Sequence, residues 1–151
     1  MTTTRESRKN LLIVWGVLVW SLCFLVYLVY AKGEARTSIF VSPEFLPGST
    51  RHATFSVMAA VILIMAFALP RFLFRVMAAK RAGEPTVQML FTPWILRMVL
   101  SMTIALIGFG LGYQSGYLKV SIPFFALTML IYALHFPNED NVNTWISTRR
   151  L

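Results

Sequence analysis

Charged side chains and cysteine are both scarce in this sequence. Charged residues make up 13% of the 151 positions, about half of the share found in soluble domains. The only cysteine is Cys23, which excludes an internal disulfide and a thiolate metal cluster. Acidic residues are the rarest charged type, with 6 Asp and Glu against 14 Lys and Arg, and the formal net charge is +8.

The charges are also clustered, so that four long runs contain none. These runs are 11–31, 53–70, 98–118 and 120–138. A helix that crosses the hydrocarbon core needs roughly 20 apolar residues, with a range of about 17–25. The sequence therefore predicts an all-α integral membrane protein with a single domain over 1–151. Its four transmembrane helices are expected at about 11–31, 53–70, 94–116 and 120–137.

The first run starts after basic residues, as a secretory signal does. A signal core is only about 7–15 residues long and is followed by a cleavage site with small residues. This run is longer and rich in aromatic residues, and Lys32 follows it directly. We interpret it as an uncleaved first span. Because no targeting segment precedes it, we expect a bacterial inner membrane.

The basic residues lie at the ends of the apolar runs, where lipid headgroups are found, rather than on a soluble face that would suit nucleic acid. Ten of them fall in the N-terminal segment, the 71–97 connection and the C-terminal tail, against four in the other two connections. The positive-inside rule then predicts that both termini are cytoplasmic. The residues expected to contact headgroups are Arg71, Arg75, Lys80, Arg81 and Arg97.

Helix signals refine the expected boundaries. Segment 72–82 follows Pro70 and contains no helix breaker, so the second helix is predicted to extend into the cytoplasm beyond the bilayer. Thr92 before Pro93 predicts the start of the third helix, and Ser121 before Pro123 predicts that of the fourth.

The third predicted helix carries small residues at spacings of four, three, four and four, which places them on one face. Small residues of this kind let two helix backbones approach closely in lipid. The sequence leaves open whether the partner helix belongs to this chain or to another. The residues of this predicted packing face are Ser101, Ala105, Gly108, Gly112 and Gly116.

The connection 32–52 contains apolar residues on the expected outer side of the membrane. They either lie on the lipid surface or form a docking patch for a partner. The residues concerned are Ile39, Phe40, Val41, Phe45 and Leu46.

The sequence offers little for catalysis, cofactor binding or transport. It has no Ser–His–Asp pattern, no metal-ligand spacing and no glycine-rich phosphate loop. His52 and His135 are predicted at opposite ends of the membrane, so they cannot share a haem iron. The centres of the four runs hold no Asp, Glu, Lys or Arg, although transport paths usually contain ionisable residues. We therefore predict no enzyme activity, no cofactor and no bound metal.

The function expected from these features is that of a small non-enzymatic subunit, scaffold or accessory factor of a larger membrane complex. The alternative is a small oligomeric channel or transporter with its path between helices or chains. The expected partners are the lipid bilayer and either other membrane proteins or copies of this chain, and no nucleic acid is expected.

Overall fold

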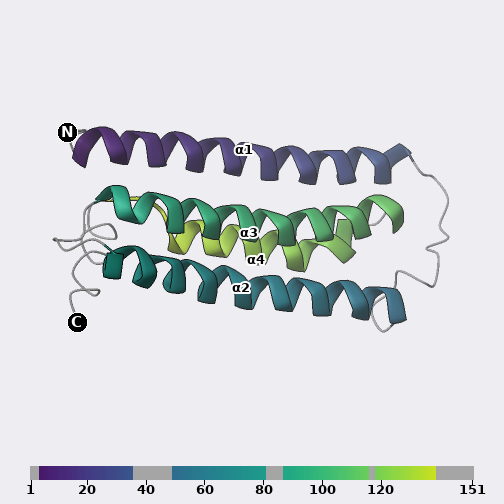
Figure 1. Ribbon diagram of the computed structural model, residues 1–151. Coiled ribbons are helices and arrows are strands. Elements are labelled where there is room, and N and C mark those ends of the chain that lie inside the picture. The colour runs from purple at the N-terminus through teal and green to yellow at the C-terminus, as the bar shows by residue number, and fades with distance from the viewer. Residues whose placement is uncertain (1–3, 36–48, 81–86, 116–117, 139–151) are drawn as a thin grey trace.

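The computed structural model describes residues 4–35, 49–80, 87–115 and 118–138. The regular structure in these ranges is entirely helical (Figure 1). The helices are α1 (Thr4–Ala35), α2 (Thr50–Lys80), α3 (Val87–Ser115) and α4 (Leu118–Leu134). The all-α class and the expected number of helices are thus confirmed for the described part of the chain.

Three of these helices are long and apolar enough to cross a membrane. The qualifying segments are Arg8–Lys32, Thr50–Met77 and Phe91–Ser115. The fourth helix, α4, is apolar but has only 17 residues. At ~1.5 Å per residue it is about 26 Å long, slightly shorter than a ~30 Å hydrocarbon core. The structure therefore supports a membrane protein with three helices long and apolar enough to span a bilayer and a shorter fourth helix.

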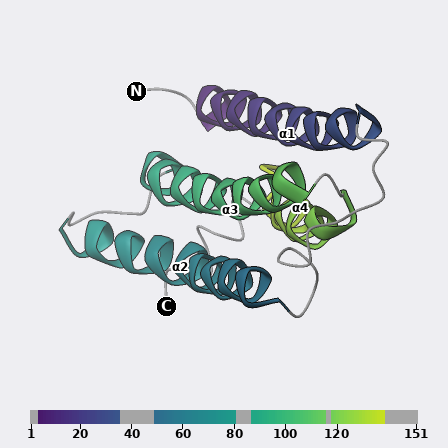
Figure 2. The same ribbon diagram turned by 90° about the vertical axis from the view of Figure 1, so that its right-hand side faces the viewer.

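The α3–α4 pair forms the centre of the bundle, with α1 and α2 on opposite sides of it (Figures 1 and 2). Two clusters of buried apolar side chains result. The first joins α1 to the central pair through Leu11, Leu22, Val29, Trp94, Met98, Ala105, Phe125 and Tyr132. The second joins α2 to the same pair through Ala59, Ile104, Leu111, Val120, Phe124 and Ile131. Each flanking helix thus buries one side and leaves its other side exposed.

Successive helices run in opposite directions, so one end of the bundle collects the start of α1, the end of α2, the start of α3 and the end of α4 (Figure 1). Basic residues are concentrated toward this end, which we call the basic end. It carries Arg8 and Lys9 on α1, Arg71 and Arg75 on α2, and Arg97 on α3.

Two prolines that we expected at helix boundaries lie within the helices. The expected start of the third helix at Thr92 is wrong, because α3 begins at Val87 and contains Pro93. The start expected at Ser121 is also wrong, since α4 begins at Leu118 and contains Pro123. Each proline removes one backbone donor near the first turns, and its fixed φ is compatible with a helix.

The second helix follows the sequence-based expectation more closely. The backbone N–H of His52 donates to Ser49 Oγ at 3.2 Å, which makes Ser49 the N-cap of α2. The helix then continues through Pro70 to Lys80. Its 31 residues are about 46 Å long at ~1.5 Å per residue, more than the hydrocarbon core requires.

Candidate functional site

All four helices meet near the basic end in a group of aromatic and polar side chains, which we call the end cluster. Its members come from every helix and from the segment that follows α4. They are Trp15 of α1, Phe67 of α2, Trp94 and Arg97 of α3, Tyr132 of α4, and His135. It contains Arg97, the one charged side chain that is buried among the residues described.

Two indole groups of the end cluster cap the C-terminal end of α4. The Nε1–H of Trp15 donates to the carbonyl oxygen of Tyr132 at 3.1 Å, and the Nε1–H of Trp94 donates to that of His135 at 3.0 Å. The last four carbonyls of a helix have no partner within the helix, and in lipid no water replaces one. The bond from Trp15 therefore satisfies one of these carbonyls, and the bond from Trp94 satisfies that of His135, directly after the helix.

The α3–α4 seam is joined by hydroxyl groups that donate to backbone carbonyls. The hydroxyl of Tyr132 donates to the Met98 carbonyl at 3.3 Å, and Thr128 Oγ1 donates to the Ser101 carbonyl at 3.0 Å. Tyr132, Thr128 and Ser101 are all fully buried. Polar groups at this seam thus hold helices together, as interhelical hydrogen bonds do in membranes.

Arg97 supplies a hydrogen-bond donor to a backbone carbonyl that Pro70 leaves without one. Proline has no backbone N–H, so the carbonyl of Ala66, four residues earlier in α2, lacks its usual helical donor. Arg97 Nε–H from α3 donates to that oxygen at 3.1 Å, and its guanidinium lies 5.3 Å from the ring centre of Phe67. Arg97 is only 9% exposed. The charged side chain expected at the headgroups is therefore placed between α2 and α3 and bonds to the backbone.

His135 lies next to the ring of Phe67, on the α2 side of Arg97. Its imidazole and the ring of Phe67 meet edge to face with centroids 6.0 Å apart. Its Nδ1 lies 3.0 Å from the carbonyl oxygen of Ile131. No group of three metal-ligating side chains forms in the described part of the chain. The arrangement is suited to capping α4 and supporting α2, and offers no nucleophile paired with a base.

The predicted packing face of α3 is directed at other helices of the same chain. A Cβ atom added to Gly108 would lie 2.5 Å from Phe124 Cβ of α4. One added to Gly112 would overlap Ser121 Oγ of α4 and lie 2.9 Å from Val29 Cγ1 of α1. Among the other predicted members of the row, Ser101 and Ala105 are fully buried, and Gly116 lies outside the described residues.

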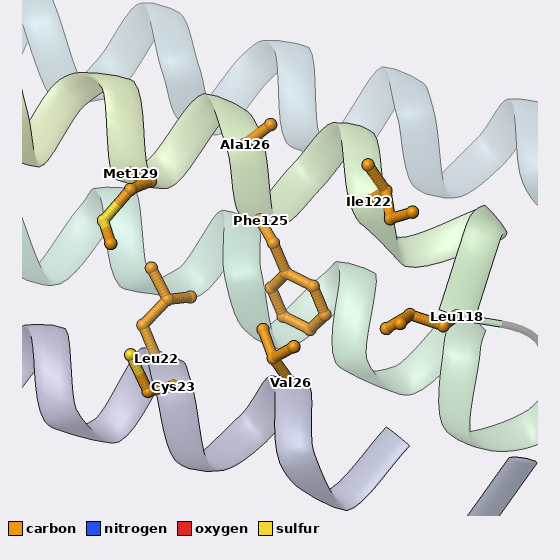
Figure 3. A pocket seen from close by; sticks show the side chains of 8 residues that line it. All are labelled: Leu22, Cys23, Val26, Leu118, Ile122, Phe125, Ala126 and Met129. Carbon is orange, nitrogen blue, oxygen red and sulfur yellow. The ribbon is translucent and has the colours of Figure 1, made fainter. Parts of the chain in front are cut away.

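A groove opens between α1 and α4 on the outside of the bundle (Figure 3). Phe125 points from α4 toward α1 in the middle of it. The groove has a volume of about 370 Å³, and every residue that lines it is apolar or a cysteine. The lining residues are Leu22, Cys23, Val26, Leu118, Ile122, Phe125, Ala126 and Met129.

The remaining residues singled out in the sequence divide into two groups. Arg71 and Arg75 are exposed on the last turns of α2, as contact with headgroups requires. The others lie where the structure does not describe side chains. These are Lys80, Arg81 and the outer-connection residues Ile39, Phe40, Val41, Phe45 and Leu46.

The sequence-based reasoning missed the tryptophan caps and the link from Arg97 to Ala66. One signal for the second was visible, because Pro70 within a helix implies a carbonyl in need of a donor. Nothing in the pattern indicated which side chain would supply it. The caps had no such signal, since Trp15 and the residue it caps are 117 positions apart.

No protein-family model, no curated protein and no solved structure matches this chain. The functional proposal therefore rests on the geometry of the bundle itself.

Proposed function

We propose that this chain is a small non-enzymatic subunit, scaffold or accessory factor of a larger complex in a bacterial inner membrane. In this proposal all four helices lie in the bilayer, and the basic end faces the cytoplasm because the positive-inside rule favours that orientation. Both termini are then cytoplasmic, and the last turns of α2 project beyond the lipid.

The observation that carries this proposal is the use made of polar groups inside the bundle. The hydroxyls of Thr128 and Tyr132 donate to backbone carbonyls across the α3–α4 seam, and the buried guanidinium of Arg97 donates to a carbonyl of α2. Groups engaged in this way fasten helices to one another and are not arranged along an open path. A bundle whose interior is held by such hydrogen bonds suits a protein whose function depends on its outer surfaces.

Those outer surfaces supply the second part of the support. The flanking helices α1 and α2 expose large apolar side chains along much of their length, among them Trp20 and Phe24 on α1 and Ile64 on α2. The groove between α1 and α4 also opens sideways (Figure 3). In a bilayer these faces contact lipid or other membrane helices.

Purification from native membranes tests this proposal. The full-length chain, tagged at one terminus, is extracted in a mild detergent and its companions are quantified against those of an unrelated small membrane protein with the same tag. We expect one or more untagged membrane proteins in near-stoichiometric amount. The Gly112→Leu variant, which disrupts the contact with Ser121, should lose them together with its fold.

A different outcome of these experiments would contradict the subunit proposal. If the chain purifies without companions, and vesicles that contain it conduct ions or small solutes, the subunit proposal is wrong. The alternative of a small oligomeric channel or transporter would then replace it.

A further inference from the structure

One face of α1 carries a regular row of large, mostly exposed apolar side chains. The row follows alternating spacings of four and three residues, the pattern by which two helices pack side by side. Each member is between 54% and 78% exposed. Its members, which we call the α1 outer row, are Ile13, Val17, Trp20, Phe24 and Tyr27.

Trp20 is at odds with a lipid environment. It is the middle residue of the apolar segment Arg8–Lys32, and its side chain is 78% exposed. Tryptophan favours the membrane interfaces, where its N–H can find an acceptor. Lipid tails at mid-depth offer no acceptor, and none of the residues that the structure describes accepts a hydrogen bond from this indole. The site thus calls for a neighbour with an acceptor at mid-depth.

This chain presents such an acceptor beside the row. Ser21 follows Trp20 directly and lies one turn from both Val17 and Phe24, so its Cα differs in depth from that of Trp20 by only ~1.5 Å. Ser21 Oγ donates its proton to the Val17 carbonyl at 2.9 Å. Its own lone pairs can accept a bond from another molecule.

The face also provides space for a large ring. Gly16 lies one turn before Trp20, is exposed, and would meet nothing within 4 Å if it had a Cβ atom. A helical side chain leans toward the N-terminus of its own helix. The indole of Trp20 and the Oγ of Ser21, which reaches back to the Val17 carbonyl, therefore both lie on the N-terminal side of their own Cα atoms. The row thus presents a projecting ring with a donor, a recess on one flank at Gly16 and an acceptor on the other flank at Ser21.

We propose that the α1 outer row binds a second copy of this chain, with the two α1 helices parallel about a two-fold axis along the membrane normal. In this dimer the Nε1–H of each Trp20 donates to Ser21 Oγ of the other copy, so the interface contains two equivalent hydrogen bonds. Only a second copy in the same orientation places the complementary groups at matching depth twice. This pairing does not depend on which other proteins the chain accompanies.

Cysteine cross-linking tests the geometry. The parent is the full-length Cys23→Ser chain in lipid nanodiscs or vesicles, into which Val17→Cys or Phe24→Cys is introduced. Ile64→Cys on α2 is the control, because Ile64 is 67% exposed and far from α1. On oxidation, the two row variants should form covalent dimers and the control should not. Equal cross-linking of row and control variants would overturn the proposal.

Fluorescence transfer between labelled copies, diluted with lipid, tests the hydrogen bonds. Since one interhelical bond is worth roughly 0.6 kcal/mol, losing both should weaken the dimer about eightfold. Trp20→Phe and Ser21→Ala should each give this loss, and the double variant should be no weaker. Thr54→Ala is the matched control, since Thr54 Oγ1 likewise donates four residues back on the exposed face of α2.

Other occupants would give different results. If lipid alone covers the row, the purified chain stays monomeric at every dilution. If a helix of another protein covers it, the row cysteines cross-link in native membranes to a different polypeptide and not to each other. Either outcome refutes the dimer. A dimer of the purified chain that has no companions in native membranes and conducts ions or small solutes in vesicles would instead refute the subunit proposal and leave this inference standing.

Discussion

Replacing Pro70 with alanine should make the bundle less dependent on Arg97. The reason lies in one carbonyl oxygen, that of Ala66, which has no helical donor while residue 70 is proline. Arg97 Nε–H occupies this oxygen at 3.1 Å. An alanine at position 70 supplies its own N–H to the same oxygen, so the arginine then competes for a site that is already filled.

The expected magnitude follows from the burial of this contact. A buried carbonyl without a partner costs about 1–3 kcal/mol, and a hydrogen bond from a charged donor contributes a similar amount. Arg97→Met removes the donor, but it also removes a buried charge and the contact with Phe67, so its effect alone is ambiguous. The difference between the two backgrounds isolates the carbonyl. We expect Arg97→Met to be about 1–2 kcal/mol less destabilising when residue 70 is alanine.

The measurement is a double-mutant cycle on the free energy of unfolding in mixed detergent micelles, with tryptophan fluorescence as the signal. The parent, Pro70→Ala, Arg97→Met and the double variant complete the cycle. Arg75→Met serves as the control, because Arg75 is exposed on α2 and should be additive with Pro70→Ala. If Arg97→Met is also additive, within about 0.5 kcal/mol, then Arg97 does not replace the missing donor and our account of the end cluster fails.

Three further predictions concern packing, topology and capping. Gly108→Ala should lower the melting temperature in detergent because its Cβ meets a side-chain Cβ on α4 at 2.5 Å, whereas Gly110→Ala, with open space around it, should not. A reporter active only in the cytoplasm should give signal when fused after Leu151 and none when inserted near Gly48, and the reverse would contradict the proposed orientation. Trp94→Phe keeps a ring but removes the N–H that caps the end of α4, so the free energy of unfolding should fall by about 1 kcal/mol.

Much of the fold could be predicted from where charge is absent. A run without charge that is long enough to cross lipid favours a helix, because a helix satisfies its backbone hydrogen bonds within the segment itself. This constraint correctly located all four helices. It located their ends less well, since Thr92 and Pro93 were interpreted as a start although α3 already begins at Val87. A proline in the sequence shows that a helix lacks one backbone hydrogen bond. Whether the helix continues past it depends on contacts with neighbouring helices.

The candidate site was less accessible to sequence reasoning. Spacing alone identified the small residues of α3, because a helix places every third or fourth residue on one face. Spacing could not identify Phe124 and Ser121 as the atoms that Gly108 and Gly112 face. The contact between Arg97 and Ala66 joins positions 31 residues apart on different helices, and only the packed bundle brings them together.

The contacts at the end of the short α4 also determine how the outer surface of α1 is held. A 17-residue helix leaves its last carbonyls near the hydrocarbon region, where free carbonyls are costly. Trp15 reaches one of these carbonyls from α1, and Trp94 reaches that of His135, directly after the helix, from α3, so both bonds also fix the positions of these helices relative to α4. With α1 held from its inner side, its outer row is presented at a constant angle. A helix presented in this way loses little further freedom when another helix packs against it, which favours association.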